Sequence, residues 1–180
     1  MDTMKTILCK IWRLTACPVA VFMLTLCISV TALVAALLSE VLLDMEPCRL
    51  CIHQRWGFVA AAVFALIGLF FRKSPKGAAI MAGLSALSFL ATSAIATYHT
   101  GVEQKWWTSA VEGCSVPASF STQDPNWMEN LMATPSARCD VIPWQDPVLG
   151  LSMANYNIAL CFGMFVICLI GAVRIYKKPA

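Results

Sequence analysis

The chain has 180 residues, of which 59% are hydrophobic and only 13% are charged, and its formal net charge is +3. A typical soluble domain carries roughly 25% charged residues, so this composition argues against a soluble globular protein and indicates an integral membrane protein. The small positive charge is explained by basic residues that flank the apolar segments, and it does not indicate a nucleic-acid-binding protein.

Four segments without charged residues define the predicted membrane spans. They cover residues 17–38, 56–71, 77–98 and 148–173. Three reach the roughly 20 residues that a helix needs to cross the hydrocarbon core, and the second is extended to 51–71 by the residues before it. Because lipid offers the backbone no hydrogen-bond partner, all four are predicted to be α-helices. We therefore predict an all-α integral membrane protein in which one domain, residues 1–180, forms a four-transmembrane-helix bundle.

The distribution of basic residues predicts the orientation of these spans. Nine of the 13 lie before the first span, between the second and third, or after the fourth: Lys5, Lys10, Arg13, Arg72, Lys73, Lys76, Arg174, Lys177 and Lys178. The positive-inside rule places these segments, and with them both termini, in the cytoplasm. The loops 39–50 and 99–147 are then predicted to face outward.

The nine cysteines fall into two groups. Five lie in the N-terminal tail or in the spans, where cysteine usually behaves as a small hydrophobic residue: Cys9, Cys17, Cys27, Cys161 and Cys168. Cys48 and Cys51 lie in the first outward loop, and Cys114 and Cys139 lie in the second. An even number of cysteines in an oxidising compartment indicates disulfides, and the simplest pairing is Cys48–Cys51 with Cys114–Cys139. A zinc site with four thiolate ligands is the less favoured alternative, because the second pair lacks the Cys-x-x-Cys spacing.

The two pairs require different explanations. A bond between Cys114 and Cys139 would stabilise a long connection by about 3–4 kcal/mol if its effect is loop-closure entropy, so a structural role is open there. Cys48 and Cys51 enclose only two residues, and a bond in so small a ring constrains little and is readily reduced. The start of a helix also favours the thiolate form of cysteine. This pair therefore indicates redox chemistry.

Arg55 follows Cys51 by four residues, which places it one turn further along the same helical face. An arginine at this depth is costly unless it reaches the headgroups or has a partner. One interpretation is a guanidinium that extends to the membrane surface. The other is a fixed cation that stabilises a thiolate at Cys51 and polarises the carbonyl of an electron acceptor.

Three sequence motifs and the second cysteine pair carry a resemblance to a known family. The motifs are "PCRLCIHQR" at the start of the second span, "YHTGVEQKWW" after the third and "GLSMANYN" at the start of the fourth. Together with Cys114 and Cys139 between the third and fourth spans, they resemble the DsbB family, bacterial inner-membrane enzymes that reoxidise a periplasmic dithiol oxidase and pass the electrons to quinone. The resemblance covers essentially the whole chain.

This resemblance implies a quinone-dependent disulfide oxidoreductase with a periplasmic DsbA-like thiol oxidase as partner and ubiquinone or menaquinone as cofactor. It implies that the partner's thiolate attacks Cys114 and that the released Cys139 attacks Cys48. Cys51 would then leave as the thiolate that donates electrons to the quinone. The outward loops would be periplasmic.

Two further residues are implied to bind the quinone. Arg55 would steady the donor thiolate beside the quinone ring, and His99 matches a family position near the quinone head. A histidine at a membrane interface can also be an ordinary hydrogen-bonding residue, and that alternative stays open for His99. His53 lies where the family varies, and no role is assigned to it.

The second outward loop is predicted to contain a short helix parallel to the membrane. Residues 124–139 are bounded by Pro125 and Pro135 and place apolar side chains at helical spacing, which is typical of an amphipathic surface helix. Simple packing on the end of the bundle is the alternative. The loop is also expected to be mobile enough to bring Cys139 to Cys48.

Two other functions fit parts of the sequence. A four-span scaffold with purely structural loop disulfides would have activity unaffected by substitution of Cys48. A protein of the vitamin K epoxide reductase type would also combine a helical bundle, a quinone and a Cys-x-x-Cys pair. In that family the extra cysteine pair precedes the Cys-x-x-Cys in the chain, whereas Cys114 and Cys139 follow it here.

Overall fold

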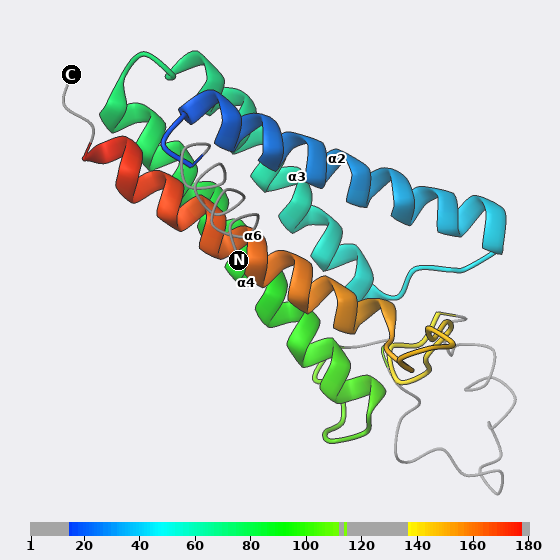
Figure 1. The fold of residues 1–180 in the computed structure, drawn as a ribbon. Helices are drawn as coiled ribbons and strands as arrows, with labels where there is room; N and C mark the ends of the chain where they lie inside the picture. The colour runs from blue at the N-terminus through cyan, green and yellow to red at the C-terminus, as the bar shows by residue number, and fades with distance from the viewer. Residues whose placement is uncertain (1–14, 112–113, 115–136, 178–180) are drawn as a thin grey trace, which may run out of the picture.

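The computed structural model describes residues 15–111, 114 and 137–177, which form a bundle of four long helices (Figure 1). The helices are α2 (Pro18–Leu43), α3 (Arg49–Phe70), α4 (Pro75–Glu103) and α6 (Met153–Tyr176). All four are long and apolar enough to cross a membrane. The predicted all-α, four-transmembrane-helix architecture is therefore confirmed. The predicted short helix in the second loop lies outside the described residues.

Serine hydroxyls cap the starts of two helices. The Ser74 hydroxyl accepts a hydrogen bond from the backbone N–H of Gly77 at the start of α4. At the start of α6, the Ser152 hydroxyl accepts one from the backbone N–H of Asn155. Each bond satisfies one of the donors that the first turn of a helix leaves without an intrahelical partner.

α4 is the central helix of the bundle. It packs most extensively against α6 and then against α3, whereas α2 packs mainly against α3. Gly57 permits the close approach of α3 to α4, because a Cβ atom at this position would overlap the side chain of Thr92. The buried residues of α2 all lie in its N-terminal half: Val21, Phe22, Thr25 and Ser29. The C-terminal half of α2 exposes apolar side chains, as expected of a helix face that contacts lipid.

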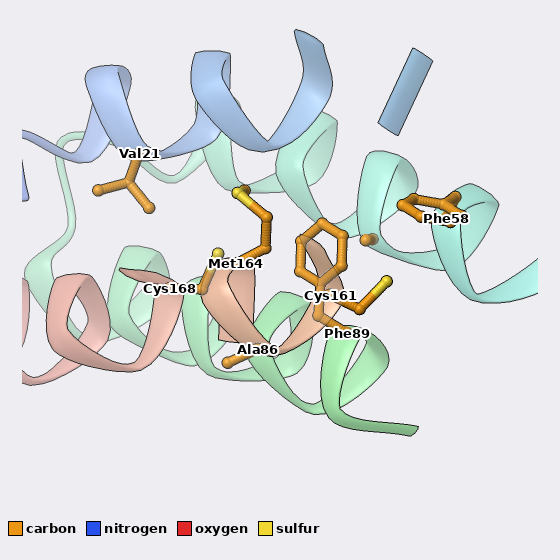
Figure 2. Packing of buried hydrophobic residues seen from close by; sticks show 8 residues of the cluster. Val21, Phe58, Ala86, Phe89, Cys161, Met164 and Cys168 are labelled. Carbon is orange, nitrogen blue, oxygen red and sulfur yellow. The ribbon is translucent and has the colours of Figure 1, made fainter. Parts of the chain in front are cut away.

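The main core cluster combines aromatic rings with small side chains (Figure 2). Phe58 of α3 and Phe89 of α4 pack edge to face, with ring centroids 6.0 Å apart and an angle of 76° between the ring planes. Cys161 and Cys168 of α6 are fully buried in the same cluster. These two cysteines pack as small core residues, in keeping with their place in an apolar span.

Three helix ends lie five residues from the predicted span boundaries. α2 continues beyond residue 38 to Leu43 and α4 continues beyond residue 98 to Glu103, whereas α6 begins at Met153 rather than at 148. α2 and α4 continue because polar residues beyond the apolar runs have partners inside the protein. Glu40 pairs with Arg55, and Glu103 contacts His99 and Ser152. The later start of α6 follows from a turn in which the backbone N–H of Gly150, at φ +65°, donates to the carbonyl of Asp146.

Candidate redox site

Four cysteines gather at one end of the bundle, beside the start of α3. Cys48 precedes the helix and Cys51 lies in its first turn, and their Sγ atoms are 3.2 Å apart. Cys114 and Cys139 belong to the long connection between α4 and α6 and are joined by a disulfide. The Sγ atoms of Cys48 and Cys139 and a ring nitrogen of His99 all lie within 4.8 Å of one another. The two cysteine pairs therefore lie side by side, and Cys139 is already next to Cys48.

The two pairs differ in oxidation state. Cys48 and Cys51 are free thiols in this structure, so the predicted disulfide between them stays a prediction. The backbone N–H of Cys139 donates to the carbonyl of Cys114 at 2.8 Å, which holds the two bonded residues together beyond the disulfide itself. Cys48, Cys114 and Cys139 are buried, and Cys51 is half-buried.

The residues immediately before and after Cys139 form an ion pair with each other. The Arg138 guanidinium donates to the Asp140 carboxylate from Nε at 2.9 Å and from Nη2 at 2.6 Å. The hydrogen bond from Arg138 holds the pKa of the Asp140 carboxyl below its usual range. The pair fixes the local backbone beside the disulfide.

Cys48 is the cysteine that the surroundings favour as a thiolate. Its Sγ caps α3 by accepting a hydrogen bond from the backbone N–H of Cys51 at 3.4 Å. The hydrogen bond with the Cys51 side chain and the nearby His99 ring lower the pKa of the Cys48 thiol to about 4, although burial of the sulfur opposes the shift. The N-terminal end of a helix favours a negative charge in the same way. The expectation of a thiolate at Cys51 concerns a state in which Cys48 is bonded to Cys139, and it stays a prediction.

His99 lies in the last two turns of α4 and contacts Cys48 through Nε2. That atom is 3.6 Å from Cys48 Sγ and 3.6 Å from Oε1 of Glu103, one turn further along α4. The other carboxylate oxygen of Glu103 accepts a hydrogen bond from the Ser152 hydroxyl at 2.5 Å. The side chains of His99 and Glu103 are only 5% and 4% exposed. Ser152, which caps α6, therefore holds the buried Glu103 carboxylate beside His99.

Two amide side chains connect His99 to α6. Gln54 Nε2 lies 3.1 Å from His99 Nδ1, and Gln54 Oε1 accepts a hydrogen bond from Asn157 Nδ2 at 2.5 Å. Asn157 Oδ1 in turn accepts one from the Cys161 thiol at 3.3 Å. These side chains form a hydrogen-bonded row across α3, α4 and α6.

Arg55 has a carboxylate partner on a neighbouring helix. Its Nη1 atom forms an ion pair with Oε1 of Glu40 in the C-terminal part of α2. The two side chains are 23% and 26% exposed, so the pair is partly accessible. This partner makes an arginine at this depth less costly than an unpaired charge would be. The predicted contact of Arg55 with a quinone stays a prediction.

A cavity of about 1020 Å³ lies beside the cysteines, between α2, α3 and α6. Its apolar wall includes Ala32, Leu33, Ala36, Phe58 and Leu160. It is also lined by polar and sulfur-containing side chains, which include Cys48, Cys51, Gln54, Arg55, His99 and Glu103, and by the charged side chains of Asp44, Glu46 and Arg138. An apolar cavity with a few converging polar groups is the usual form of a small-molecule site.

A zinc site is the other chemistry that these residue types could support. Cys48, His99 and Cys139 have the identity and the closeness of zinc ligands. However, Cys139 Sγ is bonded to Cys114, and cysteine binds zinc as a thiolate. The pairing found here therefore favours disulfide exchange over metal binding.

Sequence reasoning missed five polar residues of this end of the bundle: Glu40, Gln54, Glu103, Ser152 and Asn157. All but Glu40 lie inside the three motifs quoted for the family resemblance, and two of them carry a further indication. Glu103 follows His99 by four residues, and Asn157 lies inside an apolar segment, where polar residues often have a function. Their partners Ser152 and Gln54 could not be identified, because these lie on other segments of the chain.

Comparison with known proteins places the chain in a family. The family model for "Disulfide bond formation protein DsbB" matches residues 18–171. The chain is 30% identical to disulfide bond formation protein B of Xanthomonas axonopodis pv. citri (strain 306), over 79% of this chain and 83% of that protein. It is also 30% identical to the protein of that name from Dechloromonas aromatica (strain RCB), over 87% of this chain and 94% of that protein. No solved structure matches the chain. The chain belongs to the DsbB family of disulfide bond formation proteins and is a multi-pass membrane protein.

Proposed function

We propose that this protein is a thiol:quinone oxidoreductase that reoxidises a periplasmic, thioredoxin-like dithiol oxidase of the DsbA type. The observation that carries the proposal is the position of Cys139 Sγ within 4.8 Å of Cys48 Sγ, because Cys48 itself lines a large cavity with an apolar wall. Thiol–disulfide exchange requires an attacking sulfur close to the sulfur that it attacks. The two pairs are close enough to exchange with little motion.

The exchange steps follow from this arrangement. A thiolate of the partner attacks Cys114, which breaks the Cys114–Cys139 bond, forms a mixed disulfide and releases Cys139 as a thiolate. The partner's second thiolate then displaces Cys114, and the partner leaves with its own disulfide. Cys139 attacks Cys48 of an oxidised Cys48–Cys51 pair and releases the Cys51 thiolate. Attack by Cys114 on Cys139 restores the first disulfide and leaves Cys48 and Cys51 as thiols, the oxidation state found here.

The electrons that reach Cys48 and Cys51 need an acceptor, and the cavity fits a quinone. Its apolar wall suits an isoprenoid-bearing ring, while Arg55 and His99 offer donors to ring oxygens beside the cysteines. A bound quinone would take up two electrons and two protons and leave as the hydroquinone while Cys48 and Cys51 become a disulfide. The residues of the chain would supply position, hydrogen bonds and charge.

The proposal also assigns each end of the bundle to a cellular compartment. We place the protein in a bacterial inner membrane with both termini in the cytoplasm, because the positive-inside rule applies to the basic residues at that end. The end with the four cysteines then faces the periplasm, where a secreted dithiol oxidase can reach Cys114. The exposed apolar half of α2 beside the cavity supports entry of a lipid-soluble quinone from the bilayer.

Turnover by the purified protein tests this function. The protein in detergent is mixed with a reduced thioredoxin-like dithiol oxidase, and oxidation of the dithiol is followed with and without added ubiquinone or menaquinone. We expect oxidation beyond one equivalent only with quinone, and loss of turnover in Cys51→Ser. The matched control is Cys27→Ser, which removes an exposed cysteine of α2 and should turn over normally. Full quinone-dependent activity in Cys51→Ser would contradict the role proposed for Cys51, and no quinone-dependent oxidation by the unsubstituted protein would leave the scaffold alternative.

A further inference from the structure

Three side chains of α3 and α6 define which atoms of the row beside His99 carry hydrogens. The Cys161 thiol donates to Asn157 Oδ1, and the amide nitrogen of Asn157 faces Gln54 and donates to its oxygen. The amide nitrogen of Gln54 consequently faces His99 Nδ1 at 3.1 Å. An amide nitrogen is only a donor.

This orientation determines the state of the imidazole ring. Because Gln54 Nε2 donates to His99 Nδ1, the Nδ1 atom must be the acceptor and carries no proton. A neutral imidazole has one ring proton, which therefore resides on Nε2. Nε2 is the atom that lies 3.6 Å from Cys48 Sγ and 3.6 Å from Glu103 Oε1.

We propose that Gln54 and Asn157 are positioning residues that hold His99 in the Nε2–H tautomer, so that the ring donates towards Cys48 and the adjoining cavity. The inference deepens the proposed redox function and rests on it for its biological purpose. Its physical content is confined to side chains of this chain. The hydrogen bonds of the two amides run to each other, to His99 and to Cys161, and both amides act through the histidine.

The position of the His99 proton affects Cys48, the cysteine that Cys139 attacks in the proposed exchange. A donor hydrogen at Nε2 stabilises a thiolate at Cys48 and is also available to an acceptor oxygen in the cavity, whereas a bare Nε2 could do neither. The other ionisable side chains that line the cavity with His99 are Asp44, Glu46, Cys48, Cys51, Arg55, Glu103, Arg138 and Tyr156. The backbone of Cys139 also lies beside the ring.

Nitrogen NMR of the histidine ring tests the tautomer directly. The chain has two histidines, so His53→Asn leaves His99 as the one imidazole to observe after labelling with ¹⁵N-histidine. His53 is exposed, and its Nδ1 atom bonds to the backbone carbonyl of Arg49 in its own helix. In the reduced protein in detergent, without quinone or partner, we expect a protonated-type signal from Nε2 and an unprotonated-type signal from Nδ1. A protonated-type signal from Nδ1 would overturn the inference.

Two variants test the role of the amides. In Asn157→Asp, both oxygens of residue 157 are acceptors, so Gln54 must turn its amide nitrogen towards α6 and its oxygen towards His99. In Gln54→Glu, a carboxylate oxygen replaces the amide nitrogen. We expect Nδ1 to become protonated in both. The matched control is Asn155→Asp, since Asn155 accepts from Thr100 at 3.1 Å and does not belong to the row; it should keep the Nε2–H tautomer.

The Cys48 thiol gives a second readout. Loss of a hydrogen bond to a charged group should raise the apparent pKa of Cys48 in Asn157→Asp by about one to two units, and in Asn155→Asp it should not change. An unmoved tautomer in both variants, or an unmoved Cys48 titration in Asn157→Asp, would overturn the inference. Neither measurement uses quinone or turnover, so failure of the proposed function would leave these results unaffected.

Discussion

The sulfur atom of Cys48 has both a structural and a chemical role. Its sulfur caps α3 by accepting the backbone N–H of Cys51, a task that serine or aspartate usually performs at a helix start. The same helix terminus, the Cys51 side chain and His99 stabilise negative charge on that sulfur. A thiolate at this position also makes the reduced pair more stable and so makes its disulfide a stronger oxidant.

The titration of Cys48 is the prediction that belongs to this residue. Its pKa is lowered to about 4, compared with roughly 8.5 for an ordinary cysteine, so the thiolate should persist as the pH falls from 8 and disappear only near pH 4. The measurement is the thiolate ultraviolet absorbance of protein with reduced Cys48 and Cys51 and intact Cys114–Cys139, minus that of Cys48→Ser. Cys17→Ser, whose thiol lies outside the site, is the control. A midpoint near pH 8.5 would contradict the account.

The length of α4 determines whether the site exists at all. If the helix ended at residue 98, as the apolar run suggested, His99 and Glu103 would lie in a loop without fixed orientation. Continuation to Glu103 places both on one face, because residues four apart are neighbours on a helix. Ser152 at the start of α6 then holds the Glu103 carboxylate. The site is therefore built from helix ends as much as from loop cysteines.

The approach of α3 to α4 is the testable feature at this scale. A Cβ at position 57 would overlap Thr92 Oγ1, and that hydroxyl is held by its bond to the Ser88 carbonyl at 2.8 Å. Gly57→Ala should therefore lower the free energy of unfolding by about 1–3 kcal/mol through overpacking, measured as a lower Tm in detergent.

The control for this pair of helices is Gly83→Ala, because a Cβ there meets no neighbouring atom; its Tm should be unchanged or slightly higher. Adding Thr92→Ala to Gly57→Ala should recover part of the loss by removing the overlapping hydroxyl. Equal Tm values for Gly57→Ala and Gly83→Ala would show that the helices do not approach as closely as described.

At the level of the whole molecule, α2 creates the opening beside the site. The helix packs against the bundle through its N-terminal half and through Ala32 and Leu33. Nearer its C-terminal end, Glu40 pairs with Arg55, while apolar side chains such as Leu37, Leu38 and Val41 are exposed. The cavity lies between the C-terminal half of α2 and the helices α3 and α6. A lipid-soluble acceptor can therefore reach the cysteines from the side, whereas the soluble partner reaches them from the end of the bundle.

A bulky side chain in this cavity should weaken the reaction with quinone while leaving oxidation of the dithiol partner nearly unchanged. Ala36 lines the cavity, and Ala36→Phe should raise the KM for quinone about tenfold or more by occupying its space, with little change in single-turnover oxidation of the dithiol. The control is Val34→Phe on the same helix, because Val34 is 47% exposed and does not line the cavity. A quinone KM that is equal in both variants would contradict the placement of the acceptor.

The sequence was enough to predict the four spans, because an uncharged segment long enough to cross lipid has few alternatives to a helix. It also singled out the four cysteines and His99, since spacing and motif resemblance carry that information. The row of Gln54 and Asn157 and the ion pair of Glu40 with Arg55 could not be predicted. Each joins residues on different helices, and such contacts depend on packing angles and helix ends that apolar runs do not specify.

Trapping the bond between the two cysteine pairs tests the central claim most directly. In the double variant Cys51→Ser and Cys114→Ser, Cys48 and Cys139 lose their usual partners while their sulfurs remain neighbours. After mild oxidation in detergent, mass spectrometry of digested protein should find a peptide in which Cys48 and Cys139 are bonded. Recovery of both residues as free thiols, with no such peptide, would show that the pairs do not exchange and would contradict the account.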